Sequence, residues 1–237
     1  GFKGGLAKYF INKINAIPPE DTLDFRQLNP LIDRIKRYID LDSTNAELIA
    51  HLGIAYLMKA DYRSASLTFE ESLNQNPNYL QIRHLLAQAR INWGAQKFAE
   101  DSLLSADFHF KYALDYKPDD ESARHFLSAT YQRRSQESLE QNDIENAFKM
   151  ARMAIYVNNE SAINFVQMGR VKMESNERDS AEIAFNHAYL LDKTNEEVLL
   201  ELIDFYTEEK DVYKVKIYND MYKRARVNTK KKAKRNE

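Results

Sequence analysis

Two histidines occupy equivalent positions in the sequence and are candidate metal ligands. His84 and His125 each precede a leucine by two residues, and they lie 41 residues apart. Neutral imidazole is a common zinc ligand, but zinc sites use at least three protein ligands, often including cysteine. The chain has no cysteine and offers no third ligand beside this pair. We therefore predict no metal site here, and expect these histidines to hydrogen-bond a partner or face solvent.

Residue patterns that signal catalysis are missing from the sequence. It has no glycine-rich phosphate loop, no HExxH pair of zinc ligands, no nucleophile elbow and no cysteine nucleophile. Its carboxylates are numerous, but they follow the surface pattern of helices. We predict that the protein is not an enzyme and has no cofactor.

Four basic residues suggest a different chemistry, the binding of an acidic peptide. Charge-assisted hydrogen bonds from a lysine or arginine to a carboxylate are strong and directional. The alternative is that these cations are solvated and balance nearby Glu and Asp residues, which is the commoner role of charges on helix faces. The four residues are Arg90, Arg133, Arg170 and Lys172.

These residues fall into register because the chain repeats. The pair Leu52-Gly53 recurs with steps of 34, 41, 41 and 34 residues between the leading residues. The recurrences are Leu86-Ala87, Leu127-Ser128, Met168-Gly169 and Leu202-Ile203. A second pair, Ala65 with Phe69, recurs as Ala106 with Phe110, Ala147 with Ala151, and Ala181 with Phe185.

A 34-residue unit carrying Leu52-Gly53, Tyr56, Ala65, Phe69 and Pro77 resembles the tetratricopeptide repeat family. The resemblance covers about residues 46–222. It implies an all-α, right-handed superhelical solenoid of stacked antiparallel helix hairpins, with about 12 helices. It also implies that the protein binds other proteins.

Small residues in this unit have a physical explanation. Gly53 and Ala65 are expected where the two helices of a hairpin cross, because small side chains let helix axes approach to about 8–10 Å. Bulky residues such as Phe69 are expected to fill the space between successive hairpins.

Two units are longer than the others by seven residues, because the interval from Leu86 to Ala106 exceeds the interval from Leu52 to Ala65 by that amount. An insertion of this length is close to two helical turns, so a helix can lengthen without rotating its buried stripe. We predict two hairpins lengthened by about two turns, with one long first helix at residues 121–140. In the other long unit, Gly94 could instead start a loop, because glycine disfavours helix interiors.

The expected organisation is an N-terminal pair of helices, near residues 5–16 and 28–40, which caps a solenoid and is followed by a basic tail. The cap covers residues 1–45, the solenoid residues 46–222 and the tail residues 223–237. The solenoid units are expected at about residues 46–79, 80–120, 121–161, 162–195 and 196–222.

The family resemblance implies a concave groove, lined by the first helices, that binds a partner's peptide or helix. The alternative for each residue is packing against a neighbouring first helix. The family's chaperone-tail clamp uses Lys and Asn at fixed places, where this chain has Ala50 and Ile54, so that ligand is disfavoured. Repeat equivalence places these residues in the groove: Ala50, Ile54, His84, Gln88, His125, Ala129, Gln132, Arg133, Val166, Arg170 and Met173.

A second candidate surface consists of Trp93 and Phe98, next to the lengthened hairpins. Exposed aromatic residues there would indicate a partner or self-association site, so a homo-oligomer is left open. The slightly favoured alternative is that Trp93 packs against the neighbouring long helix.

Charge is unevenly distributed along the 237 residues, whose formal net charge is -2. Residues 223–237 contain eight basic residues and one acidic one, which leaves a net charge of -9 for the rest. The stretch could attract nucleic acid or an anionic membrane, but it lacks the aromatic residues of a single-strand binder, so nucleic acid is disfavoured. No apolar run spans a bilayer. A protein or peptide partner is expected, in the cytoplasm or periplasm, and a sequence opening on Gly1 leaves an upstream anchor open.

Overall fold

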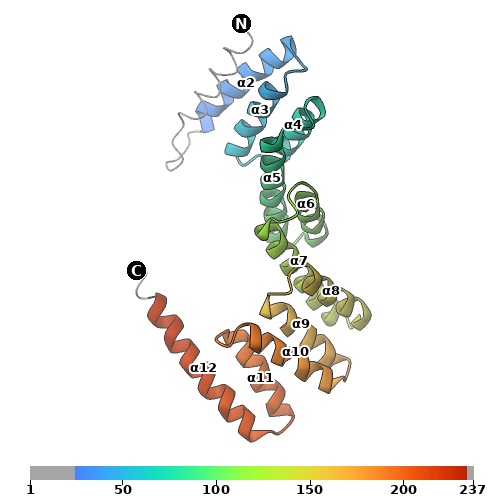
Figure 1. Ribbon diagram of the computed structural model, residues 1–237, viewed down its shortest axis with the longest axis vertical. Helices are drawn as coiled ribbons and strands as arrows, with labels where there is room; N and C mark the ends of the chain where they lie inside the picture. Colours follow the sequence, from blue (N-terminus) through green and yellow to red (C-terminus); the bar gives the residue numbers. More distant parts are fainter. Residues whose placement is uncertain (1–24, 234–237) are drawn as a thin grey trace. The chain divides into compact units, whose positions relative to one another are not determined.

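The computed structural model describes residues 25–233, and this part of the chain consists of α-helices and no strands (Figure 1). The predicted all-α fold is confirmed. The helix expected near residues 5–16 and the loop at residues 17–20 lie outside the described residues. The helices are α2 (Phe25–Leu41), α3 (Ala46–Met58), α4 (Tyr62–Gln75), α5 (Leu80–Ala99), α6 (Leu103–Tyr116), α7 (Glu121–Glu140), α8 (Ile144–Val157), α9 (Ala162–Glu174), α10 (Arg178–Leu191), α11 (Glu196–Glu208) and α12 (Val212–Ala233).

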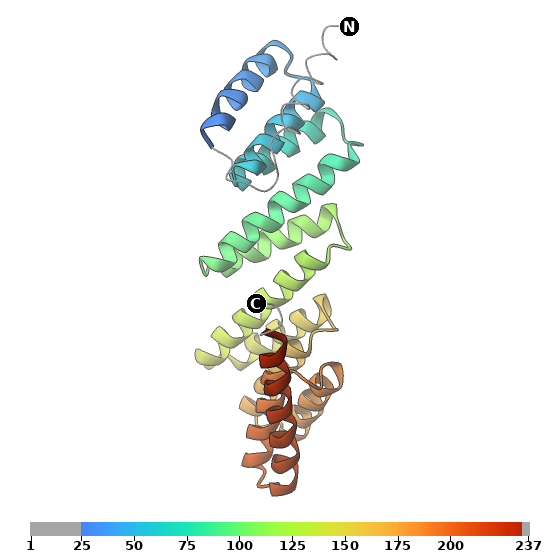
Figure 2. The same ribbon diagram turned by 90° about the vertical axis from the view of Figure 1, so that its left-hand side faces the viewer.

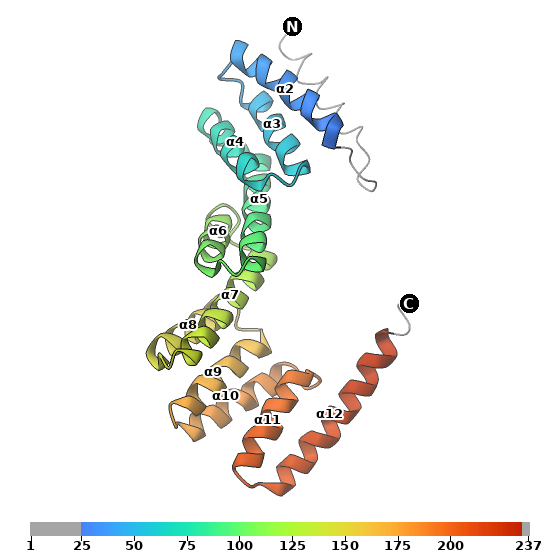
Figure 3. The ribbon, with the colours of Figure 1, turned by 180° about the vertical axis from the view of Figure 1, so that it is seen from behind.

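The described residues form two compact units, which divide between Ala123 and Arg124 and are described separately. In the first unit α3 packs against α4, and α5 packs against both α4 and α6. In the second unit α9 packs against α8 and α10, and α11 packs against α9, α10 and α12. Figures 2 and 3 show the two helices of each hairpin running antiparallel, side by side. Helical hairpins are therefore the building block of both units.

Each of the five hairpins turns through one residue in the left-handed helical region. These residues have φ between 56° and 60° and none is glycine: Ala60, Asp101, Asn142, Asn176 and Lys210. At the first turn, the N–H of Ala60 donates to the carbonyl of Leu57 and the N–H of Asp61 donates to that of Tyr56. This is the hydrogen-bond pair that commonly ends a helix. The Asp61 carboxylate then accepts from the N–H of Ser64, so that one turn ends α3 and caps α4.

The lengthened hairpins owe their length to their first helices. Helices α5 and α7 have 20 residues each, whereas α3, α9 and α11 have 13. The second helices α4, α6, α8 and α10 all have 14 residues. The predicted extension of two hairpins by about two turns is confirmed, and Gly94 lies inside α5 and not in a loop.

Contact between a glycine of the first helix and a phenylalanine of the second closes three of the hairpins. A Cβ atom added to Gly53, Gly94 or Gly169 would lie less than 3.0 Å from the ring of Phe69, Phe110 or Phe185 respectively. The small residue therefore makes room for the ring within its own hairpin. The expectation that Phe69 fills the space between hairpins was incomplete, because its ring also occupies the crossing point itself. In the second hairpin the residue equivalent to Gly53 is Gly94, and not Ala87 as the repeat spacing suggested.

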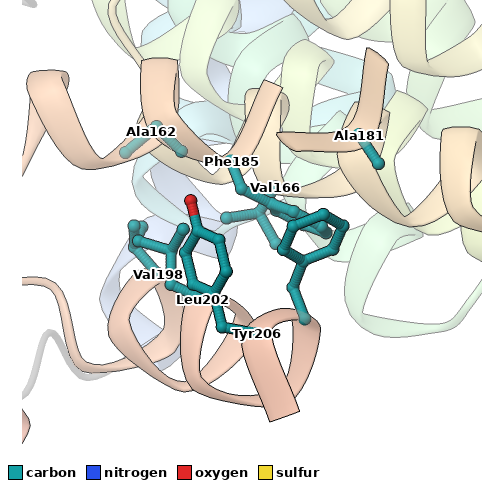
Figure 4. Packing of buried hydrophobic residues seen from close by; sticks show 9 residues of the cluster. Ala162, Val166, Ala181, Phe185, Val198, Leu202 and Tyr206 are labelled. Atoms are coloured by element: carbon teal, nitrogen blue, oxygen red, sulfur yellow. The ribbon is translucent and has the colours of Figure 1, made fainter. Parts of the chain in front are cut away.

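The core of the second unit joins α9, α10 and α11 (Figure 4). Val166 and Phe185 meet Leu202 and Tyr206 of α11 there, and all four side chains are buried. Polar links also join successive first helices: Gln132 of α7 donates to Asn164 of α9, and Gln167 of α9 donates to Ser135 of α7 at 3.0 Å.

The last helix is longer than expected. α12 has 22 residues and continues to Ala233, whereas the sequence suggested an end near Arg226. Residues 223–233, assigned to a separate tail, therefore continue the second helix of the last hairpin.

Candidate functional site

In the first unit, the predicted groove residues differ in their accessibility. Ala50 is 1% exposed, so it belongs to the core and offers no surface to a partner. Ile54 is half-buried and packs against the same core. His84 and Gln88 of α5 are exposed, and Gln88 donates to Asn92 one turn further along the helix at 3.0 Å.

The groove residues predicted in the second unit divide in the same way. Val166 is fully buried in the core, so it also cannot line a surface. Gln132 is half-buried and is bonded to Asn164. Ala129 and Met173 are half-buried, whereas His125 and Arg133 are exposed.

The cations proposed to hold an acidic peptide are engaged within the chain. Arg90 donates to Glu70 at 2.5 Å and is 6% exposed. Arg170 bridges to Glu201 at 2.5 Å and to Glu197 at 3.0 Å. Lys172 pairs with Glu177 at 2.8 Å and lies 4.4 Å from the ring centre of Phe148. These three side chains balance carboxylates of this chain, which is the alternative considered above.

Trp93 belongs to a polar and aromatic cluster between α5 and α6, which we call the Arg90 cluster. Its ring stacks on His109 with the centroids 4.0 Å apart. The Arg90 guanidinium lies 4.1 Å from the ring centre of Tyr112 and donates to His109 Nδ1 at 3.2 Å. In the first unit, therefore, Trp93 packs within its own hairpin. Phe98, its companion in the predicted second surface, is half-buried.

Buried charge dominates the electrostatics of the Arg90 cluster. Burial lowers the pKa of His109, and the positive charges of Arg90 and Lys97 lower it further, to about 4. The imidazole is therefore neutral near pH 7 and can accept the hydrogen bond from Arg90. The only signal in the sequence was the misfit at Arg90, where the repeat pattern would favour an aromatic residue.

Comparison with known proteins gives the following matches. No family model matches the chain, and no curated protein matches it. Among solved structures, the chain is similar to YrrB, described as a tetratricopeptide protein with an unusual peptide-binding site, at 11% identity over 81% of this chain and 91% of that chain, with a TM-score of 0.45. It is similar to PilF of Pseudomonas aeruginosa at 13% identity over 94% and 93% of the two chains, with a TM-score of 0.44. A third is the TPR2AB domain of yeast Sti1 in complex with pHSP90, at 14% identity over 98% and 96%, with a TM-score of 0.40.

The repeated hairpins, with a glycine of the first helix packed under a phenylalanine of the second, agree with the landmarks in the sequence. The chain has a tetratricopeptide-type fold. In this fold the first helices of successive hairpins lie side by side, and α9 and α11 do so in the second unit. The predicted groove residues Arg170 and Met173 lie on α9.

A cavity of about 350 Å³ lies where these two tetratricopeptide first helices meet, and we call it the α9–α11 pocket. Phe185 and Phe205 belong to its lining, with their ring centroids 5.7 Å apart. Two ion pairs connect the lining to α11: Arg170 of α9 reaches Glu201, and Arg178 of α10 reaches Glu208 at 2.9 Å. The complete lining is Arg170, Met173, Glu174, Arg178, Phe185, Glu201, Asp204, Phe205 and Glu208.

Negative charge exceeds positive charge in this pocket. Four of the lining residues are acidic and two are basic, and both arginines also bind further glutamates, Glu197 and Glu209. Burial opposes the charge of Arg170, but its bonds to Glu201 and Glu197 outweigh this effect and raise its pKa. Burial also raises the pKa of Asp204, and the neighbouring charges of Glu201 and Glu208 raise it further. Asp204 thus lies among like charges.

A larger hollow, of about 660 Å³, follows α8 in the same unit. It is lined by Phe148, Met153 and Tyr156 together with charged residues of both signs. Tyr156 is 85% exposed. Within residues 25–233 no three potential metal ligands come together, and none of the helices described is long and apolar enough to cross a membrane.

Proposed function

We propose that this protein is a noncatalytic interaction scaffold that binds a segment of a partner protein on the first helices of its hairpins. The α9–α11 pocket carries this proposal, because it combines three apolar side chains, Met173, Phe185 and Phe205, with charged groups on two neighbouring first helices. In pockets that bind ligands, apolar side chains supply contact area and polar groups fix the orientation of the ligand.

Rigid packing supports the pocket. The Phe185 ring fits against Gly169, and Val166 and Leu202 are buried beside it (Figure 4). Ion pairs of Arg170 and Arg178 connect α9 and α10 to α11. A preorganised surface loses little conformational entropy when a partner binds, so a modest contact area can still give useful affinity.

A selection of random peptides displayed on phage would test the proposal. Peptides selected on the wild-type chain should bind Met173→Trp at least about tenfold more weakly, because the larger side chain fills the pocket. The matched control is Ile183→Trp, which changes a residue of α10 that is 71% exposed and does not line the pocket. Circular dichroism of both variants checks the fold. Equal binding to the two variants would place the partner surface elsewhere.

A further inference from the structure

The α9–α11 pocket also contains information about the chemistry of the partner. Its two arginines are both used in ion pairs that cross the pocket. Glu174 on α9 and Asp204 on α11 also line the cavity, so each of the two first helices contributes one further carboxylate. Neither carboxylate has a hydrogen bond or ion pair to another described residue of the chain. Two anionic groups therefore face the same cavity without a cation of their own.

We propose that the α9–α11 pocket binds a lysine or arginine side chain presented by a partner protein. This inference rests on the proposed function and specifies the residue type that the groove selects. A cationic head group would meet Glu174 and Asp204, and the aliphatic stem would lie along Met173 and Phe205. Lysine and arginine combine a charged head with an apolar stem, which matches a pocket lined by four acidic residues and by the apolar side chains of Met173, Phe185 and Phe205.

The geometry distinguishes this occupant from an acidic one. A carboxylate entering the pocket would need a free cation, but Arg170 binds Glu201 and Glu197, and Arg178 binds Glu208 and Glu209. It would also approach Asp204, whose own charge is already disfavoured by its neighbours. Bringing like charges together costs free energy, whereas a cation between Glu174 and Asp204 relieves that repulsion.

Small model compounds test the inference without a known partner. The probes are the Nα-acetyl methylamides of lysine, arginine, norleucine and glutamate, titrated into the full chain and followed by amide chemical shifts. Lysine and arginine should give saturable shifts at about millimolar concentration, confined to the amides around the pocket. Norleucine, which has a similar stem without the charge, should bind at least about fivefold more weakly.

The variant that removes the charge is Glu174→Gln with Asp204→Asn, which leaves both arginine pairs in place. This double variant should bind lysine about fivefold more weakly than the wild type. Added salt should likewise weaken the binding of lysine to the wild type, because it screens the carboxylates. The matched control is Glu160→Gln with Asp220→Asn, two exposed acidic residues outside the pocket. Equal binding of lysine and norleucine, or unchanged lysine binding in the charge-removed variant, would overturn the inference.

Two further outcomes are separable. If selected peptides depend on Met173 but carry no lysine or arginine, and lysine itself causes no shifts, the groove function stands and the inference fails. If lysine binds the pocket but no selected peptide depends on Met173, the pocket takes a cation, but the groove function fails and the assignment to a partner protein fails with it. The basic residues 223–237 of a second copy are another source of cations. If the amide chemical shifts around the pocket change with protein concentration alone, a second copy of the chain supplies the cation, and the assignment to a partner protein is overturned.

Discussion

At the scale of single residues, three glycines set the spacing of their hairpins. Gly53, Gly94 and Gly169 each lie under a phenylalanine ring from the second helix of the same hairpin, closer than a Cβ atom would allow. Helix propensity alone favours replacing a helical glycine with alanine by about 1 kcal/mol. At these positions the added methyl group meets a buried ring, so propensity and packing make opposite predictions.

At Gly169 we expect the packing cost of an added methyl group to exceed the gain in helix propensity. Gly169→Ala should lower the free energy of unfolding by up to about 2 kcal/mol, because overpacking a core typically costs about 1–3 kcal/mol and the better helix propensity of alanine offsets about 1 kcal/mol of that cost. Urea denaturation measures the difference. Combining it with Phe185→Leu should cost less than the sum of the single changes, because the smaller side chain makes room for the methyl group. A more stable Gly169→Ala protein would show that the ring moves aside freely.

The buried imidazole of His109 predicts a pH dependence. Its pKa falls from 6.5 to about 4 in the folded protein. The unfolded state therefore takes up the proton first as pH falls, so this contribution to stability is complete above pH 6.5 and is lost between pH 6.5 and about 4. The loss should be on the order of 3 kcal/mol.

His109→Gln removes the titrating group and keeps an oxygen that can accept from Arg90. The difference in unfolding free energy between wild type and variant, measured from pH 7 to pH 4, should narrow or reverse as pH falls. Carboxylates titrate in both proteins and cancel in the difference. Parallel curves would mean that His109 is protonated as easily in the folded state as in the unfolded one.

At the scale of the elements, the hairpin turns repeat more regularly than the helices they join. Each turn places a non-glycine residue at positive φ, which costs about 1–2 kcal/mol for most side chains and less for asparagine. Ala60→Gly should therefore stabilise the protein by about 0.5–1 kcal/mol, after the greater chain entropy of glycine in the unfolded state is subtracted.

The matched control for this prediction is Asn176→Gly in the turn between α9 and α10. Asparagine tolerates the left-handed conformation, so this change should be close to neutral in thermal denaturation. An equal gain at both sites would contradict the explanation from backbone strain.

Helix lengths show how far the sequence could predict this structure. The bounds of α7 follow from the spacing of small and apolar residues, and residues 121–140 are helical as expected. The equivalence of Gly53 could not be resolved in the same way. The insertion in α5 is almost two turns long, so Ala87 and Gly94 lie on nearly the same face of that helix. Only the contact with Phe110 identifies which of them lies at the crossing.

The candidate site was predictable only in part, for a similar reason. Arg170 and Met173 were placed near the groove by repeat equivalence, and both line the α9–α11 pocket. The opposite side comes from Asp204 and Glu201 of α11, which belongs to the next hairpin, so the charge balance depends on how two hairpins pack. Ala50 and Val166 were assigned to the groove by the same equivalence, but burial excludes them from contact with a partner.

At the scale of the whole molecule, the two signs of charge are assigned to different parts of the sequence. The acidic pocket belongs to α9 and α11, whereas residues 223–237 carry eight basic groups against one acidic group. α12 continues through this basic stretch to Ala233, so its cations up to Lys232 are carried on a helix. A high local density of positive charge attracts polyanions without reading their sequence.

The two surfaces should therefore respond independently to substitution. Changing Lys230, Lys231 and Lys232 to Gln should weaken the binding of duplex DNA, with the salt slope falling by about 0.9 for each phosphate contact removed. The same change should leave the affinity of a groove-selected peptide unchanged. Met173→Trp should instead weaken the binding of that peptide and leave the binding of DNA unchanged. Fluorescence anisotropy with labelled DNA and labelled peptide measures both on the same proteins. Loss of peptide binding in the lysine variant would mean that the basic end of α12 takes part in partner recognition, and the scaffold would then have to be treated as one continuous binding surface.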